Sequence, residues 1–178
     1  MEKIIFDTET TGLLAPRAAP LSRQPYITEI YAVKIDENFN IISELESFIK
    51  IPIHVPDFIT KITRIDDKML ENAPTFEEIS DEIFNFFSTA DEMIAHNLPF
   101  DKSMIKYQFK RANLPIVFPL KQTCTIQHSM SLEGRRLNLS ALHEKLLGKS
   151  LVSAHRAKND VFGLVRVYHK MLEMGLCE

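Results

Sequence analysis

Two carboxylates at the end of an N-terminal apolar segment are the residues of this chain best placed to do chemistry. Residues 4–9 read Ile-Ile-Phe-Asp-Thr-Glu, and the alternation of a β-strand would point Ile5, Asp7 and Glu9 to one face. An apolar N-terminal strand is usually central in its sheet, so both carboxylates are expected close together beside a core. Like charges in such a place need a proton or a cation to offset repulsion and desolvation. Mg²⁺ is the expected cation, since it prefers carboxylate oxygens.

An alternative interpretation places the end of the strand before these two side chains. Asp7 and Glu9 would then only cap the turn formed by residues 10–12, Thr-Thr-Gly. The two carboxylates taken alone do not decide between a cation site and a capped turn.

A third acid, Asp101, stands at the start of a predicted helix. Apolar residues follow it at offsets of four, eight and eleven, namely Ile105, Phe109 and Ala112, so the carboxylate lies on or beside the buried face. The alternative is an ordinary acid near a helix N-terminus, stabilised by the helix dipole. The outward residues of the same helix are predicted to form a solvated face: Lys102, Lys106 and Lys110.

A histidine and a fourth acid come close together near the end of the chain, as His155 and Asp160. Asp160 lies on the apolar stripe of a predicted C-terminal helix. On a regular helix five residues separate two side chains by about 140°. The two can therefore converge only if His155 precedes the helix, with Ser153 or Ala154 at the turn. A histidine near a helix start is by itself more often structural than catalytic.

The elements that must hold these residues follow from the hydrophobic pattern. Strands are predicted over residues 3–8, 27–36, 41–51 and 93–95, with a hairpin turn at residues 37–40. Helices are predicted over residues 76–87 behind a Thr75–Glu78 capping box, 99–112, 139–147 and 156–174. This order predicts an α/β fold with a mixed sheet, three antiparallel strands followed by parallel strands, flanked by helices. Residues 14–25, with three prolines, are predicted to form an irregular loop.

Composition and charge narrow the class of protein. The 178 residues, 45% hydrophobic and 25% charged, suit a single domain over residues 1–178. No run approaches the ~20 apolar residues of a membrane span, and the first residues lack a signal-peptide layout, so a cytoplasmic protein is expected. A net charge of −3 argues against a protein that grips long duplex through many phosphates. A short single-stranded end could still bind, because metal ions supply local positive charge.

Together, these segments resemble the DEDDh, or DnaQ-like, 3′–5′ exonucleases of the ribonuclease H-like fold, a family that includes the proofreading subunit or domain of bacterial DNA polymerase III. The motifs, in chain order, are residues 6–13 (Phe-Asp-Thr-Glu-Thr-Thr-Gly-Leu), 95–101 (Ala-His-Asn-Leu-Pro-Phe-Asp) and 155–160 (His-Arg-Ala-Lys-Asn-Asp). Weaker matches lie at residues 27–30, 63–70 and 137–147. The resemblance therefore covers essentially the whole chain.

The resemblance implies two divalent cations, Mg²⁺ or Mn²⁺, held by four carboxylates: Asp7, Glu9, Asp101 and Asp160. Two such ions roughly 3.5–4 Å apart stabilise both the attacking and the departing oxygen of a phosphodiester. His155 would be the general base that takes a proton from the attacking water, because imidazole titrates near neutral pH. The expected reaction is hydrolysis of the terminal phosphodiester of single-stranded DNA, with nucleoside 5′-monophosphates released one at a time.

Further positions match residues that lie beside the terminal nucleotide or its strand in the family: Thr8, Gly12, Leu13 and Asn97. Gly12 permits close backbone approach, and Leu13 can wedge against a base. The proline-rich loop follows Leu13 and is expected to shape access to the site. A polymerase partner would have to contact the surface of the domain, since no long segment follows the last predicted helix.

Other functions are compatible with parts of the sequence. An RNA-trimming exonuclease of the same family would use the same chemistry, and no residue points to a reader of the 2′-hydroxyl. An inactive nucleic-acid-binding module on the same fold predicts loss of at least one acid, and none is missing. A structural zinc protein would use Cys124, His128 and Cys177, whose spacing matches no recognised zinc site.

Overall fold

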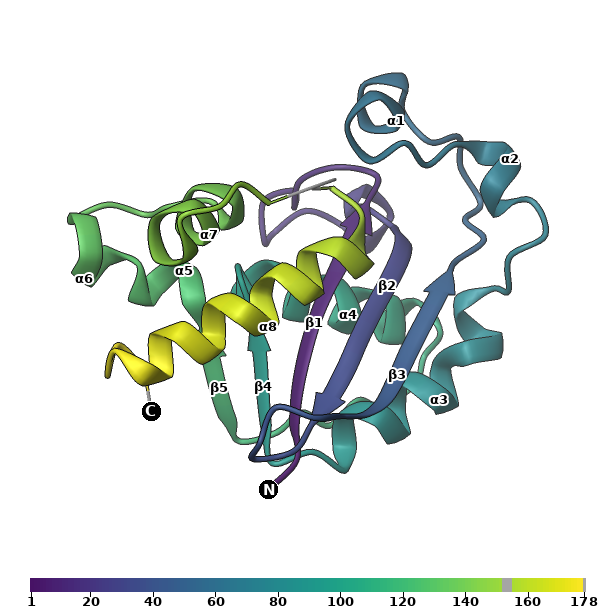
Figure 1. Cartoon of the computed structure of the whole chain (residues 1–178). Helices are drawn as coiled ribbons and strands as arrows, with labels where there is room; N and C mark the ends of the chain where they lie inside the picture. Colours follow the sequence, from purple (N-terminus) through teal and green to yellow (C-terminus); the bar gives the residue numbers. More distant parts are fainter. Residues whose placement is uncertain (152–154, 178) are drawn as a thin grey trace.

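The computed structural model describes residues 1–151 and 155–177, which form a five-stranded mixed sheet flanked by helices (Figure 1). The strands are β1 (Lys3–Thr10), β2 (Ile27–Ile35), β3 (Ile41–Phe48), β4 (Glu92–Ala95) and β5 (Lys121–Cys124). Their spatial order is β3-β2-β1-β4-β5. β1 pairs antiparallel with β2 and β2 with β3, whereas β4 runs parallel to β1 and β5 to β4. The predicted α/β class, with antiparallel strands followed by parallel strands, is confirmed.

β1 lies at the centre of the sheet and extends farther than the sequence predicts. It runs to Thr10, and its register with β2 places Glu9 opposite Glu29. Asp7 and Glu9 both belong to this strand. The alternative in which these two side chains only cap a turn is therefore wrong.

Helices flank the sheet on both faces. The longer ones are α3 (Phe76–Ser88), α4 (Leu98–Arg111), α7 (Leu139–Leu147) and α8 (Ala157–Glu173). They agree with the predicted helices, and Thr75 and Glu78 form the expected capping box at the start of α3. Asn138 caps α7, which ends at Gly148 in the left-handed conformation. Among the described residues, no helix combines the length and the apolar character that a bilayer crossing requires.

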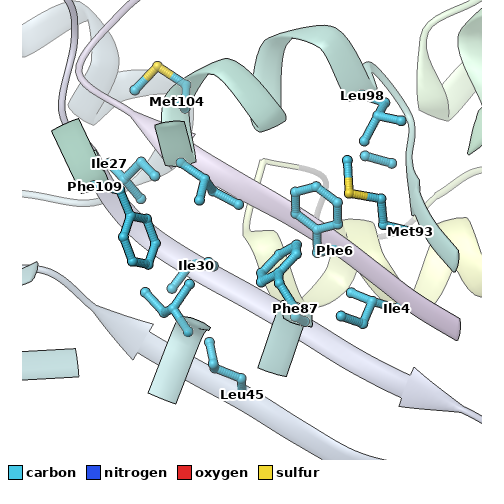
Figure 2. Packing of buried hydrophobic residues seen from close by; sticks show 14 of the residues in the cluster. Ile4, Phe6, Ile27, Ile30, Leu45, Phe87, Met93, Leu98, Met104 and Phe109 are labelled. Atoms are coloured by element: carbon cyan, nitrogen blue, oxygen red, sulfur yellow. The ribbon is translucent and has the colours of Figure 1, made fainter. Parts of the chain in front are cut away.

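The alternation of side chains along β1 builds a separate core on each face of the sheet. On one face, Ile4 and Phe6 pack with α3 and α4. Figure 2 shows Phe6 beside Phe87 of α3, and their ring centroids lie 4.9 Å apart in an edge-on arrangement. On the other face, Ile5 packs with α7 and α8. Asp7, two residues along the same face as Ile5, therefore points to the α8 side.

Several short elements are not predictable from the hydrophobic period. They are η1 (Leu21–Arg23), α1 (Asp57–Thr63), α2 (Asp67–Leu70), α5 (Thr125–His128) and α6 (Met130–Glu133). None of these is longer than seven residues, which is too short for a 3.6-residue repeat to show. The prediction of a strand over residues 41–51 is wrong at its end. β3 stops at Phe48, and Lys50 instead bridges to Thr75 beside the start of α3.

Candidate active site

Three carboxylates from the two ends of the chain meet where the C-terminal end of β1 faces the first turn of α8. One oxygen from each of Asp7, Glu9 and Asp160 lies within 4.8 Å of the other two. β1 supplies Asp7 and Glu9 from alternate positions, and Asp160 stands in the first turn of α8. The exposed fractions of Glu9 and Asp160 are 9% each, so water reaches these charges poorly.

The fourth predicted acid, Asp101, borders this cluster from the opposite face of the sheet. It stands in the first turn of α4 with an exposed fraction of 3%, and its Oδ1 accepts a hydrogen bond of 2.7 Å from the Thr8 hydroxyl. Asp101 is not one of the three acids that share the 4.8 Å spacing. Its charge nevertheless acts on Asp7. The site thus consists of an acid triplet with a fourth carboxylate on the Asp7 side.

Burial raises the pKa values of all four carboxyl groups, and repulsion from the other acids of the site raises those of Asp7 and Glu9 further. The pKa of Asp7 is raised well above its usual value by burial first, then by the charges of Asp101 and Glu9. Burial, followed by the charge of Asp160, raises the pKa of Glu9 to about 8. Burial raises the pKa of Asp101 to about 7 and also raises that of Asp160. At neutral pH this cluster is unfavourable to ionise without a cation.

Glu92 shows how the same protein accommodates a buried acid that has cationic partners. Its side chain is fully buried, and the ammonium groups of Lys3 and Lys121 lie 3.4 Å from Oε2. No lysine or arginine forms such a pair with Asp7, Glu9 or Asp160 among the described residues. The cluster therefore lacks the protein cations that balance Glu92.

One carboxylate oxygen of Asp160 is buried without a hydrogen-bond partner among the described residues. This atom is Oδ1, whereas Oδ2 accepts a hydrogen bond of 3.0 Å from the backbone N–H of His155. A buried unpaired carboxylate oxygen is costly, and here it belongs to an all-carboxylate donor set. That set fits a hard divalent cation such as Mg²⁺ or Mn²⁺.

His155 precedes α8, as the convergence with Asp160 requires. Its backbone is left-handed, with φ of 68°, and Arg156 is the N-cap residue of the helix. The 140° separation on a regular helix therefore does not apply to it. The His155 side chain is exposed, at the rim of the acid triplet. The turn expected at Ser153 or Ala154 lies outside the described residues.

The four residues predicted to contact the substrate differ in exposure: Leu13 and Asn97 are exposed, Gly12 is half-buried and Thr8 is buried. Leu13 is 87% exposed, and Asn97 is exposed at the N-cap position of α4, where its side chain makes no cap hydrogen bond. A Cβ at Gly12 would meet no atom within 4 Å, so the backbone there is open to approach. Thr8 is buried and its hydroxyl is used by Asp101, so a substrate contact of Thr8 stays a prediction.

Glu29 is a residue of the site that sequence reasoning did not single out. It is 2% exposed on β2, opposite Glu9, and both its oxygens face the start of α8. The Arg156 guanidinium donates to Glu29 at 2.8 and 3.2 Å, and the Ala157 backbone N–H donates at 3.1 Å. Glu29 thus fixes the turn of chain that carries His155 and Asp160. The signal in the sequence is weak, because the residues of this ion pair lie 127 positions apart.

We expect Glu29→Ala to lower the free energy of unfolding by about 2–4 kcal/mol, because it removes a buried ion pair and leaves the Ala157 N–H unpaired. Urea denaturation in Mg²⁺ buffer measures this loss. Glu46→Ala is the matched control, since Glu46 lies on β3 and pairs with Lys158 of α8 at the exposed surface. Its effect should stay below about 1 kcal/mol. Equal losses for the two variants would contradict the role given to Glu29.

The raised pKa values predict how the pH changes the stability of the metal-free protein. Each carboxyl group holds its proton more tightly in the folded protein than in the unfolded chain, where the pKa is about 4. The folded protein therefore binds more protons between about pH 4 and pH 8, and its free energy of unfolding falls as the pH rises. In chelator we expect a fall of roughly 2–5 kcal/mol across this range.

Denaturation at a series of pH values, with chelator and with saturating Mg²⁺, measures this dependence. Mg²⁺ should restore most of the stability at the alkaline end, since it binds only the ionised carboxylates. A stability that is independent of pH in chelator would contradict the repulsion described for Asp7, Glu9 and Asp160.

The residues proposed for a zinc site do not converge. Cys124 belongs to the core under α3 and α4, whereas Cys177 belongs to the core under α8, on the other face of the sheet. Among the described residues, the acid triplet is the group of side chains placed to share an ion.

Sequence comparison relates the chain to an exonuclease family and to DNA polymerase III proteins. The RNase_T family model, described as an exonuclease, matches residues 4–168. DNA polymerase III PolC-type from Caldanaerobacter subterraneus subsp. tengcongensis is 34% identical over 172 residues, covering 97% of this chain and 12% of that relative. DNA polymerase III subunit epsilon from Haemophilus influenzae is 28% identical over 175 residues, covering 95% of this chain and 66% of that relative. The chain thus spans only a small part of the PolC-type protein.

Solved structures share the fold at low sequence identity. The nuclease domain of 3′hExo, a DEDDh family member bound to rAMP, has a TM-score of 0.77 at 17% identity, covering 98% of this chain and 93% of that one. Escherichia coli exonuclease I in complex with a dT13 oligonucleotide has a TM-score of 0.77 at 17% identity, covering 97% of this chain and 41% of that one. These likenesses extend the agreement from sequence motifs to the whole sheet and its helices.

Proposed function

This chain belongs to the exonuclease family whose model spans residues 4–168, and from that premise we propose that it hydrolyses single-stranded DNA from the 3′ end. Each cycle breaks the terminal phosphodiester and releases a nucleoside 5′-monophosphate. The observation that carries the proposal is the acid triplet of Asp7, Glu9 and Asp160, with a buried carboxylate oxygen that has no partner among the described residues. Bound divalent cations would offset this unfavourable arrangement of carboxylates, and hydrolysis of a phosphodiester can use such cations.

Two divalent cations, Mg²⁺ or Mn²⁺, would be held by four carboxylates: Asp7, Glu9, Asp101 and Asp160. Bound there, the cations would stabilise negative charge on the attacking and departing oxygens of the phosphodiester. Asp101 lies outside the acid triplet, but its charge acts on Asp7, which would be shared between the two groups of ligands. The Thr8 hydroxyl holds Asp101 in this position.

His155 is the proposed general base. A general base must lie within reach of the attacking water, and histidine is the side chain that most often takes this role. The backbone N–H of His155 donates to Asp160, which holds the residue that carries this exposed ring at the start of α8. Glu29 and Arg156 hold the same turn from β2. His155 would accept the proton of the water as it attacks phosphorus and pass it to solvent.

The terminal nucleotide would lie over β1, between Leu13 and the start of α4. Leu13 offers an exposed apolar surface for a base, and Gly12 lets the sugar-phosphate backbone approach. The exposed Asn97 would contact the strand at the start of α4. Thr8 would act on the nucleotide mainly through its backbone, since its hydroxyl is used by Asp101.

DNA is the preferred substrate in this proposal, with a proofreading or end-trimming role in the cytoplasm. The relatives named DNA polymerase III and the dT13 complex of exonuclease I support DNA. The rAMP complex of 3′hExo supports the alternative, an RNA-trimming enzyme. A polymerase is the proposed protein partner, through the surface of the domain.

Digestion of end-labelled strands tests the proposal. The substrates are 5′-labelled single-stranded DNA, a mismatched primer-template and RNA, each with Mg²⁺, Mn²⁺ or chelator, using protein free of zinc. We expect a ladder that shortens from the 3′ end with either metal, no change in chelator, and faster digestion of DNA than of RNA. Equal digestion in chelator, or early release of the labelled 5′ nucleotide, would contradict the proposal.

A further inference from the structure

A cavity of about 500 Å³ opens directly beside the proposed nucleotide position, between the loop of residues 14–25 and the outer face of α4. The loop contributes Leu14, Ala15 and Arg17, and the helix contributes Ser103, Lys106 and Tyr107. The cavity begins one residue after Leu13 and two residues after Asp101. Its lining residues therefore follow, along the chain, the two segments that carry Leu13 and Asp101 of the candidate active site.

A second cavity, of about 610 Å³, lies at the other end of α4. The helix contributes Gln108, Lys110 and Arg111, and the loop contributes Leu21 and Ser22. The remaining walls come from Tyr26 before β2, from residues 50–52 after β3 and from the start of α3. The same loop and the same helix thus line both cavities.

The face of α4 between the two cavities is a polar and basic stripe. Ser103, Lys106, Tyr107 and Lys110 are spaced by three and four residues, so they project from one side of the helix. α4 has 14 residues and is about 21 Å long. That length matches roughly three to six phosphates of a single strand.

The loop of residues 14–25 is held against α4 by buried polar groups. The Arg111 guanidinium donates to the backbone carbonyl oxygens of Leu21, Gln24 and Pro25, at 3.1 Å to Leu21 and 2.9 Å to Pro25. The Gln24 side chain is 2% exposed, and it binds both the N–H and the carbonyl oxygen of Ala15. These contacts fix the loop as one wall of the surface along α4 that holds both cavities, which we call the α4 groove.

Charge along these cavities is positive although the whole chain is acidic. The chain has a net charge of −3, yet five basic residues and one acid line the two cavities: Arg17, Lys50, Lys106, Lys110 and Arg111, with Glu77. Among the described residues, no carboxylate lies within ion-pair distance of Lys106 or Lys110. The hydrogen bonds of Arg111 go to neutral oxygens.

We propose that the α4 groove binds the part of the nucleic acid strand upstream of the nucleotide being removed. The inference rests on the proposed function, because it takes the strand end at Asp7 and Asp101 as its starting point. Phosphates would contact Arg17, Lys106 and Lys110 in turn. Tyr107, half-buried between Lys106 and Lys110, offers an aromatic ring on which a base can stack. In this proposal Lys106 and Lys110 contact the substrate, whereas the sequence predicted only a solvated face for them.

Binding of a fluorescent decathymidylate in chelator tests the groove without any cleavage. We expect Lys106→Ala with Lys110→Ala to raise the Kd at least about tenfold at low salt. The slope of log Kd against log salt should fall by about 1.4, since each phosphate contact to a single strand contributes about 0.7. Tyr107→Ala should raise the Kd about fivefold or more with an unchanged slope.

Lys61→Ala with Lys170→Ala is the control, because it removes the same charge from α1 and from the far end of α8. A Kd and a salt slope that change equally in the control and in the α4 variant would overturn the proposal. So would an α4 variant that binds like the wild type. Failure of the proposed function is seen separately, as wild-type protein that binds the oligonucleotide but releases no nucleotide when Mg²⁺ is added.

Discussion

Asp7→Asn is expected to lower kcat by roughly a thousandfold or more, because Asp7 is the acid on which the charges of Asp101, Glu9 and Asp160 all act. The same change should stabilise the metal-free protein at neutral pH by roughly 1–3 kcal/mol. It removes a carboxyl group whose ionised form is disfavoured by burial and by repulsion from Asp101 and Glu9. Loss of activity together with a gain in stability distinguishes a cation site from a structural carboxylate.

Initial rates on 5′-labelled single-stranded DNA and urea denaturation in chelator measure the two effects on one preparation. Asp81→Asn is the matched control, because Asp81 is exposed on α3. It should leave both the rate and the free energy of unfolding unchanged. An Asp7→Asn protein that is folded and digests DNA at the wild-type rate would contradict the assignment. One that loses both activity and stability would show Asp7 to be structural.

His155→Asn is expected to lower kcat by about a hundredfold to ten-thousandfold, the usual contribution of a general base. Asparagine is the appropriate substitute for two reasons. It tolerates the left-handed backbone found at His155, where φ is 68°. It also keeps the backbone N–H that donates to Asp160. The variant therefore removes the imidazole and leaves the turn before α8 intact.

The pH dependence of kcat separates a base from a residue that only contacts substrate. The wild-type rate should rise with pH as the general base loses its proton, and His155→Asn should lack the part of the rise that belongs to this base. His169→Asn is the control, since it places the same change on the exposed surface of α8. A His155→Asn profile that is lower but has the same shape would contradict the role of general base.

The central strand shows how much of the site the sequence can predict. β1 is apolar up to Phe6, and alternation alone places Asp7 and Glu9 on one face. The packing of Asp101 and Asp160 also follows from the period of their helices. These predictions succeed because each rests on a local repeat.

What the sequence could not predict depends on contacts between distant segments. Glu29 meets Arg156 only because β1 and β2 pair in one register, and no local pattern specifies that register. The α4 groove depends on Arg111 binding the backbone of the loop of residues 14–25. From the sequence, Lys106 and Lys110 could be predicted only as an outer helix face. They line cavities only because the loop of residues 14–25 packs beside α4, and this packing depends on contacts between distant segments.

Anomalous diffraction from crystals soaked with Mn²⁺ and a nucleoside 5′-monophosphate is the most direct test of the cation site. We expect two peaks roughly 3.5–4 Å apart. The first should lie within ligand distance of Oδ1 of Asp160, and the second between Asp7 and Asp101. No peak at these carboxylates, at a Mn²⁺ concentration that supports full digestion of DNA, would contradict the account.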